Sequence, residues 1–466
     1  MPSARHPDRE TPFARLGAAL ADFCERWFPD AFVFALIAVI VVFLFGLSIG
    51  ERPAALARAF GGSFWSLIPF TMQMTLVIIG GFVVASSPPV ARGIARLAEI
   101  PKTGRGAVAF TAFFAMATSL LSWGLSLIFT GLLVRELTRR VDRLDYRAVA
   151  AAAYLGLGSV WAFGLSSSAA LLQATPSSIP PSLLPVTGVL PLSQTIFLWP
   201  SIVSACLLIA VSVAIAYFSA PGPAHAKTAA AYGVSFAPAE PASHETRTPG
   251  EWLERSRVPV YLVAALMAGA IVLEFHDKGG IAALDLNTFN LVFLTAGLLL
   301  HGRARSFLTS VSSSVPATAG VLIQFPFYAG IFGLISKTAI AGVLARAFIA
   351  VTTRGTFPIV VALYSAALGL FVPSGGGKWV IEAPYVMAAA NSWRIHLGWT
   401  VQIYNAAEAL PNLVNPFWML PLMGILKVRA RELAGYSVLQ LLFHLPLVLF
   451  LCWLFARMIP YAPPSW

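Results

Sequence analysis

The sequence predicts an all-α polytopic membrane protein made of two inverted repeats, with about nine transmembrane helices plus two re-entrant hairpins. Of the 466 residues, 58% are hydrophobic and only 11% are charged, and the mean hydropathy is +0.78. Soluble domains carry about 25% charged residues, so this chain needs lipid as its solvent. Long apolar runs, and helix-breaking sites at matching places in the two halves, support the same fold class.

A membrane-spanning helix needs about 20 mostly apolar residues, and nine runs meet or approach this length. They are 31–50, 64–87, 148–176, 196–219, 258–273, 284–300, 307–336, 397–426 and 436–456. The run 284–300 is short and carries Asp285, and Glu408 interrupts the run 397–426.

The first 30 residues indicate an amphipathic segment. They carry charges of both signs and no short apolar core, which excludes a cleavable signal peptide. Thr11 and Pro12 are typical of a helix start. Apolar side chains then recur at helical spacing at Phe13, Leu16, Leu20, Phe23 and Trp27. We expect this helix to lie at the membrane surface.

The distribution of positive charge indicates the orientation in the membrane. The net charge is +11, and most of the 31 lysine and arginine residues fall in 1–30, 88–106, 135–147, 220–257, 301–306 and 427–435. These segments share one side if the N-terminus is cytoplasmic and both hairpins return to the side they left. The sequence therefore predicts a multi-pass protein of the bacterial inner membrane. It contains no basic-aromatic motif for nucleic acid.

Two stretches do not fit as simple spans. Residues 107–134 hold Ser119 and Ser122 near their middle, and 356–390 hold a proline followed by Ser374 and three glycines. Such a run cannot continue a helix, and freed backbone groups are tolerated in a membrane only where protein or a water-filled cavity covers them. Each stretch is therefore predicted to be a re-entrant hairpin of two half-helices.

The order of these features repeats. Residues 31–219 are predicted as the first repeat and 281–466 as the second. Each contains two spans, an interfacial helix, a hairpin, a broken span and a closing span. A proline-rich flexible cytoplasmic linker is predicted over 220–257, and a connecting transmembrane helix over 258–280. That single crossing inverts the second repeat, an arrangement typical of secondary transporters.

The breaks carry the residues that could bind ions. Half-helix N-termini suit a carboxylate, whereas free carbonyls, hydroxyls and amide oxygens suit a small cation such as Na⁺. The predicted substrate-binding residues are Ser122, Ser166, Ser167, Ser168, Ser374, Gly375, Gly376, Gly377, Lys378 and Asn412. The predicted cation-coupling residues are Ser119, Glu408, Asn412 and Asn415. The alternative for each serine is a hydroxyl bonded to its own helix.

Ionisable residues inside spans are functional candidates. Lys378 and Glu382 are spaced i, i+4, so they either neutralise each other or leave Lys378 to bind the substrate anion. Glu408 either couples transport to a proton or Na⁺ or lies in an aqueous vestibule. His444 is interpreted as a hydrogen-bonded core histidine.

Several motifs resemble those of the short-chain fatty acid transporter family (AtoE type). They are the run 371–379 with its three glycines, 324–331, 408–421 with Asn415-Pro416-Phe417-Trp418, and in the first half 122–136 with the Gly164-Leu165-Ser166 break. The resemblance covers nearly the whole chain outside the linker and tails.

This resemblance implies uptake of short-chain fatty acids such as acetoacetate or butyrate. It also implies the ion-transporter superfamily fold, elevator-type movement, a homodimer, and coupling to Na⁺ or H⁺ without any cofactor. Ala162-Phe163, Ser167, Ala170 and Lys378 depart from the family pattern. An apolar Phe163 and an added cation at Lys378 could change the substrate, so the prediction is a small monocarboxylate or related organic anion.

A membrane enzyme and a channel are alternatives to a transporter, and both fit the sequence less well. A membrane enzyme needs a catalytic cluster at membrane depth, and neither the carboxylates nor the scattered Cys24, Cys206 and Cys452 form one in the sequence. A channel predicts a continuous polar lining, whereas the polar residues concentrate at paired breaks. A channel, or a transporter for a different organic anion, stays open as the alternative.

Overall fold

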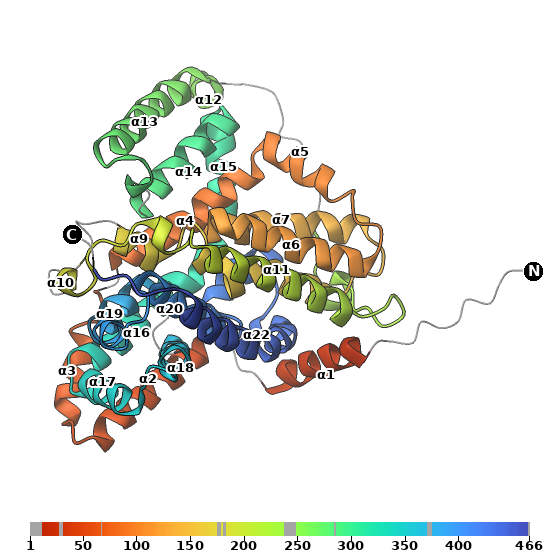
Figure 1. Ribbon diagram of the computed structural model, residues 1–466. Coiled ribbons are helices and arrows are strands. Elements are labelled where there is room, and N and C mark those ends of the chain that lie inside the picture. The colour runs from red at the N-terminus through yellow and green to blue at the C-terminus, as the bar shows by residue number, and fades with distance from the viewer. Residues whose placement is uncertain are drawn as a thin grey trace, which may run out of the picture.

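The predicted all-α architecture is confirmed. The computed structural model describes residues 12–27, 31–66, 68–174, 179, 183–236, 248–283, 286–370 and 375–464. Within these ranges every extended regular element is a helix (Figure 1). In the described part of the chain, six helices are long and apolar enough to cross a membrane, or up to seven if the bent pair at 71–97 is one span. Further apolar helices over 35–48, 287–301 and 357–369 are shorter than this length, and the count of nine stays a prediction.

The chain order of the helices follows the predicted order of segments. The first half contains α1 (Pro12–Trp27), α2 (Ala31–Ser48), α3 (Pro53–Gly61), α4 (Ile68–Ser86), α5 (Pro88–Leu97), α6 (Gly104–Leu121), α7 (Trp123–Arg140), α8 (Tyr146–Leu155), α9 (Ser168–Ala174), α10 (Leu184–Thr187) and α11 (Trp199–Ser219). The second half contains α12 (Pro249–Arg255), α13 (Val258–Asp277), α14 (Leu286–His301), α15 (Ala304–Ser314), α16 (Ala319–Ser336), α17 (Ile340–Val351), α18 (Phe357–Gly369), α19 (Gly375–Ser392), α20 (Leu397–Asn412), α21 (Leu420–Leu426) and α22 (Ala430–Met458).

Helices α6 and α7 form the first hairpin. The helix breaks at Ser122, whose side chain caps α7 by accepting a hydrogen bond from the backbone N–H of Leu125 at 3.3 Å. The hydroxyl of Ser126 donates to the carbonyl of Ala115 at 2.6 Å. Because this bond joins residues on opposite sides of the break, α6 and α7 are antiparallel and lie side by side (Figure 1).

Helices α18 and α19 form the second hairpin. The hydroxyls of Tyr364 and Tyr385 lie 2.9 Å apart, and Ser365 bonds to Glu382, so these two helices are also antiparallel. Residues 371–374, which contain Ser374, lie outside the described residues. Whether either hairpin is re-entrant in the bilayer stays a prediction.

The broken spans occupy the centre of the molecule. Every residue of α8 and of α20 is buried. Small side chains allow this close packing, since α8 contains alanine at 148 and at 150–153. After α8 the chain continues as a π-helical turn (Gly156–Val160) and a 3-10 turn (Trp161–Phe163) before α9 begins. Helix α20 ends at Asn412, so both spans are interrupted where polar residues were predicted to break them.

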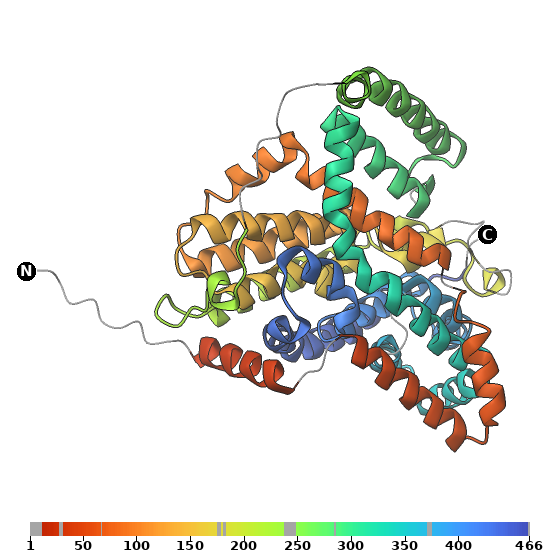
Figure 2. The same cartoon turned by 180° about the vertical axis from the view of Figure 1, so that it is seen from behind.

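Two groups of helices flank this centre. Helices α12 to α15 gather at one edge, and α2, α3 and α17 lie at another (Figure 1). From behind, α15 continues through a short 3-10 turn into α16, and the pair runs from the α12–α14 group toward α2 and α3 (Figure 2). The amphipathic helix α1 is present as predicted and packs along α22, with the rings of Phe13 and Phe443 5.8 Å apart.

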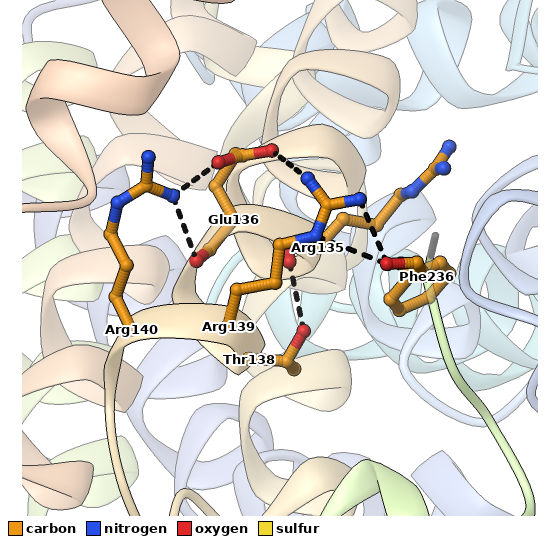
Figure 3. A network of polar contacts seen from close by, with 6 residues as sticks. All are labelled: Arg135, Glu136, Thr138, Arg139, Arg140 and Phe236. Atoms are coloured by element: carbon orange, nitrogen blue, oxygen red, sulfur yellow. Dashed lines mark hydrogen bonds and ion pairs between the residues drawn. The ribbon is translucent and has the colours of Figure 1, made fainter. Parts of the chain in front are cut away.

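The described part of the predicted linker is attached to the helical body. Arg139 donates to the carbonyl of Phe236 at 2.9 Å, and the guanidinium of Arg135 lies 4.7 Å from the centre of the Phe236 ring (Figure 3). Glu136 accepts from Arg139 at 2.7 Å and also pairs with Arg140. These contacts hold 229–236 against the end of α7, while 237–247 lie outside the described residues.

Candidate functional site

The breaks of the two central spans contact each other directly. The hydroxyl of Tyr154, at the end of α8, donates to the carbonyl of Asn412 at 2.8 Å. The side-chain amide of Asn412 in turn donates to the carbonyl of Leu157 at 3.4 Å. A helix that ends inside the protein leaves carbonyls that must find other donors. Each break donates a hydrogen bond to a carbonyl of the other. The two interruptions therefore form one polar centre.

The first hairpin reaches this centre through its tip. The backbone N–H of Leu165 donates to the carbonyl of Leu120 at 2.8 Å, and Ser166 accepts from the backbone N–H of Trp123 at 3.2 Å. Gly164 allows this approach, because a Cβ there would lie 2.5 Å from the carbonyl oxygen of Leu120. Ser122 and Ser166, which the sequence placed together as substrate ligands, are therefore neighbours.

The second hairpin, from the second half of the chain, meets the same centre. Asn415, just after α20, donates to the carbonyl of Leu370 at 3.2 Å, immediately before the tip. The hydroxyl of Tyr404 donates to the carbonyl of Gly375, the first residue of α19. Gly375 also lies against the first break, since a Cβ there would be 2.9 Å from the Trp161 ring. The helix ends that flank the second hairpin's tip thus contact both breaks, Leu370 through Asn415 and Gly375 through Trp161.

Several predicted site residues carry buried polar atoms without a partner. The hydroxyl oxygens of Ser119 and Ser167 and the side-chain oxygen of Asn412 have no hydrogen bond within the described residues. Ser168 lies against Gly375 and Gly376 of the second hairpin. An unpaired buried polar group costs about 1–3 kcal/mol, so each of these oxygens is a candidate partner for a ligand or water.

Three charged side chains meet between α19 of the second hairpin and α20. They are Lys378, Glu382 and Glu408, and we call them the charge cluster. All three are at most 1% exposed. The ammonium of Lys378 pairs with Glu408, lies 3.5 Å from Glu382, and donates to the carbonyl of Ser365 at 2.6 Å. The i, i+4 contact of Lys378 with Glu382, one of the two alternatives for this pair, is present, and substrate binding by Lys378 stays a prediction. Glu408 belongs to the same cluster, which its spacing in the sequence did not show.

Tyr404 links the charge cluster to the hairpin tip. The ring of Tyr404 lies 4.7 Å from the ammonium of Lys378 and packs against Trp379 with ring centroids 4.7 Å apart. Its hydroxyl bonds to Gly375. Tyr154, Ser365 and Tyr404 were not predicted from the sequence, because a tyrosine or serine in an apolar helix is ordinarily a packing residue. Tyr404 alone had a local signal, since it lies four residues before Glu408 and so shares its helix face.

The start of α8 is fixed by charged groups at its N-terminal end. Asp145 caps α8 by accepting from Ala148 at 2.9 Å and also accepts from the backbone of Lys227 at 3.0 Å. Burial raises the pKa of its carboxyl, and these hydrogen bonds offset part of that rise. Arg147 pairs with Asp22 of α1 at 2.6 Å. Partial burial raises the pKa of Asp22, but hydrogen bonds from Arg147 and Lys227 outweigh this and leave it below its usual value.

His444 lies apart from the polar centre, on α22. Its ring nitrogen is 2.8 Å from the hydroxyl of Ser212 on α11, as expected for a hydrogen-bonded core histidine. Among the described residues no group of three His, Cys, Asp or Glu side chains could hold a metal ion. The chemistry at the polar centre therefore consists of backbone N–H groups, hydroxyls, one amide and the charge cluster.

Comparison with known proteins finds relatives over nearly the whole chain. The family model described as short chain fatty acid transporter matches residues 13–455. A protein of Escherichia coli (strain K12) named "Putative short-chain fatty acid transporter" is 33% identical over 438 residues, which cover 92% of this chain and 97% of that protein. A protein of the same name from Haemophilus influenzae is 30% identical over 441 residues, covering 93% and 98%.

Two solved structures are similar over most of their length. The Neisseria gonorrhoeae protein MtrF, described within a class of antimetabolite efflux pumps, is 13% identical with a TM-score of 0.47 and covers 96% of this chain and 99% of its own. The Alcanivorax borkumensis YdaH transporter is 16% identical with a TM-score of 0.46, covering 92% and 99%. Scores below 0.5 do not establish a common fold.

The family assignment follows from the sequence relatives. The family and both curated relatives are transporters rather than enzymes, and the apolar helices make this chain a multi-pass membrane protein. Because the family model spans nearly the whole chain and a relative is 33% identical over almost its full length, this protein belongs to the short-chain fatty acid transporter family.

Proposed function

We propose that this chain is a secondary active transporter of short-chain fatty acids or related small monocarboxylates, of the acetoacetate and butyrate class, coupled to a cation. The observation that carries the proposal is the meeting of two broken spans and two hairpins at one buried polar centre. Interrupted helices at matching positions are typical of the substrate site of secondary transporters.

The polar centre suits a small carboxylate. Helix α19 begins with three glycines, so its first backbone N–H groups are not covered by side chains, and the helix N-terminus carries partial positive charge. The unpaired hydroxyls of Ser119 and Ser167 could donate to a carboxylate, and the unpaired oxygen of Asn412 could accept from a protonated group or bind a cation. The apolar surroundings, Trp161 and Phe163 among them, suit a short alkyl chain.

The proposed transport mechanism, oligomeric state and orientation are those expected for this class of transporter. We propose elevator-type movement in a homodimer of the bacterial inner membrane, with a cytoplasmic N-terminus. Helix α13 lies in the candidate span with the smallest buried share, 11%, which leaves it for lipid or a second copy to cover. The positive charge of the predicted cytoplasmic segments supports this orientation.

The proposed function is tested by uptake of radiolabelled acetoacetate and butyrate into proteoliposomes, with an inward Na⁺ or H⁺ gradient imposed separately. Protein-free vesicles are the necessary control, because undissociated short acids cross lipid unaided. Saturable uptake and counterflow above that control are expected. Current that does not saturate, without counterflow, would instead indicate a channel. Absence of both, with folded protein, would show that the substrate is a different anion.

Asn415→Ala is expected to lower the rate of counterflow at least about tenfold without reducing expression, because it removes the bond that ties Leu370 to the second break. Ser374→Ala is expected to do the same from the hairpin tip. Asn287→Ala is the matched control, since Asn287 lies on α14 and bonds to Gln73. Wild-type counterflow in the Asn415 and Ser374 variants would remove these residues from the site.

A further inference from the structure

The charge cluster carries one more negative than positive group. Lys378, Glu382 and Glu408 are each at most 1% exposed, and their formal charges sum to minus one if both carboxyls are ionised. An unneutralised charge in the protein interior costs several kcal/mol even after relaxation. Buried groups in this position ordinarily bind a cation or take up a proton. The cluster therefore requires one further positive charge.

The place that a metal cation would take is already filled. The ammonium of Lys378 lies among Glu408, the carbonyl of Ser365 and Glu382. Gly369 closes a further side, because a Cβ there would lie 3.3 Å from a Glu408 oxygen and 3.4 Å from the Lys378 nitrogen. A Na⁺ ion needs several oxygen ligands and would be repelled by the adjacent ammonium, whereas a proton needs one oxygen.

We propose that the coupling ion is a proton and that the charge cluster is its carrier, with one proton shared by Glu382 and Glu408 beside Lys378. This inference rests on the proposed transport function and names its coupling ion. The proton forms an O–H bond with a carboxylate oxygen on one side of the membrane, and that bond breaks when the proton leaves on the other side. One proton moves with one monocarboxylate anion, so the cycle carries no net charge.

The position of the charge cluster explains how proton movement is coupled to substrate movement. Lys378 follows Gly375 by one helical turn, and Tyr404 contacts both. A substrate carboxylate at the tip would be repelled by a cluster of charge minus one and accepted by a neutral cluster. The other titratable groups that face the carboxylates are Tyr364 of α18, Tyr385 of α19 and Tyr404 of α20.

The decisive variant is Glu408→Gln, which keeps the shape of the side chain and makes the cluster permanently neutral. We expect it to lower acetoacetate counterflow much less than driven accumulation, because counterflow needs no net proton movement. Accumulation driven by a pH gradient is expected to fall at least about tenfold. Glu382→Gln gives the same test should Glu408→Gln fail to fold. Glu99→Gln, at an exposed position, is the matched control.

Wild-type transport supplies two further criteria. We expect accumulation to follow an imposed pH gradient, to be absent with a Na⁺ gradient alone, and to be insensitive to a membrane potential set by potassium and valinomycin. Accumulation driven by Na⁺ alone, or wild-type accumulation by Glu408→Gln, would overturn the proton assignment while leaving the transport function intact.

A measurement without substrate tests the protonation of the charge cluster separately from the transport function. Infrared spectroscopy of the purified protein at neutral pH is expected to show the carbonyl stretch of a protonated carboxyl that disappears in Glu408→Gln and persists in Glu99→Gln. Absence of such a band in the wild type would refute the shared proton whatever the vesicles transport. Presence of the band with no transport of any tested acid would instead refute the proposed function.

Discussion

Lys378→Met is expected to destabilise the protein by about 3–5 kcal/mol, because it leaves two buried carboxyls without their cation. Methionine has a similar length and fills the space, so the loss is electrostatic rather than a cavity. The ammonium that it removes lies among Glu408, Glu382 and the carbonyl of Ser365. A large fall in the thermal unfolding midpoint of the detergent-solubilised protein is the expected observation.

A matched control exists in the same chain. Lys278 pairs with Glu274 at 2.5 Å, also four residues apart, but both side chains are about 40% exposed. Exposed pairs of this kind contribute at most about 1 kcal/mol, so Lys278→Met should change the midpoint little. Adding Glu382→Gln and Glu408→Gln to Lys378→Met should restore much of the stability. Equal effects of Lys378→Met and Lys278→Met would show that the charge cluster is not held as described.

The second large effect is expected for Gly156→Ala, at the π-helical turn after α8. A Cβ at Gly156 would lie 2.2 Å from the carbonyl oxygen of Ala115 and 2.5 Å from the hydroxyl of Ser126. Both atoms belong to the first hairpin, and they bond to each other. The methyl group must therefore push the hairpin away from the broken span, because a backbone carbonyl cannot turn aside as a flexible side chain can.

We expect Gly156→Ala to lower stability by about 1–3 kcal/mol and to reduce counterflow at least about tenfold. Gly93→Ala is the control: it places the same methyl group on α5, where no atom lies within 4 Å, and helix propensity favours alanine there. The measurements are the thermal midpoint and acetoacetate counterflow in parallel. A Gly156→Ala protein with both values unchanged would contradict the close approach of hairpin and break.

These predictions depend on different parts of the molecule. The Gly156→Ala variant tests the packing of the first hairpin against the first broken span. The Lys378→Met variant tests the buried charges between α19 and α20. If the polar centre binds the substrate, both variants lose transport, but only for Lys378→Met should neutralising Glu382 and Glu408 restore the stability. That rescue distinguishes an electrostatic role from a packing role, and a double-mutant cycle measures the coupling between the residues.

Composition and pattern determined much of this protein by themselves. The scarcity of charge required a lipid solvent, and the interruptions at Ser122, the glycines at 375–377 and the polar residues near 166 and 412 located where helices must end. These are local properties, because a helix breaks wherever proline, glycine or competing side-chain bonds make it costly. The i, i+4 pair of Lys378 and Glu382 was visible for the same reason.

Contacts between distant segments were decided only by the tertiary structure. Tyr154 and Asn412 are far apart in the sequence yet share a hydrogen bond, and Glu408 joins Lys378 because α20 packs between α18 and the first break. No local rule predicts such partners, since many polar residues have the same spacing and only the fold selects which of them meet. Isolated in the sequence, Glu408 could have been a vestibule carboxyl; packed against a buried ammonium and a second carboxyl, it becomes part of a cluster whose charge must be balanced.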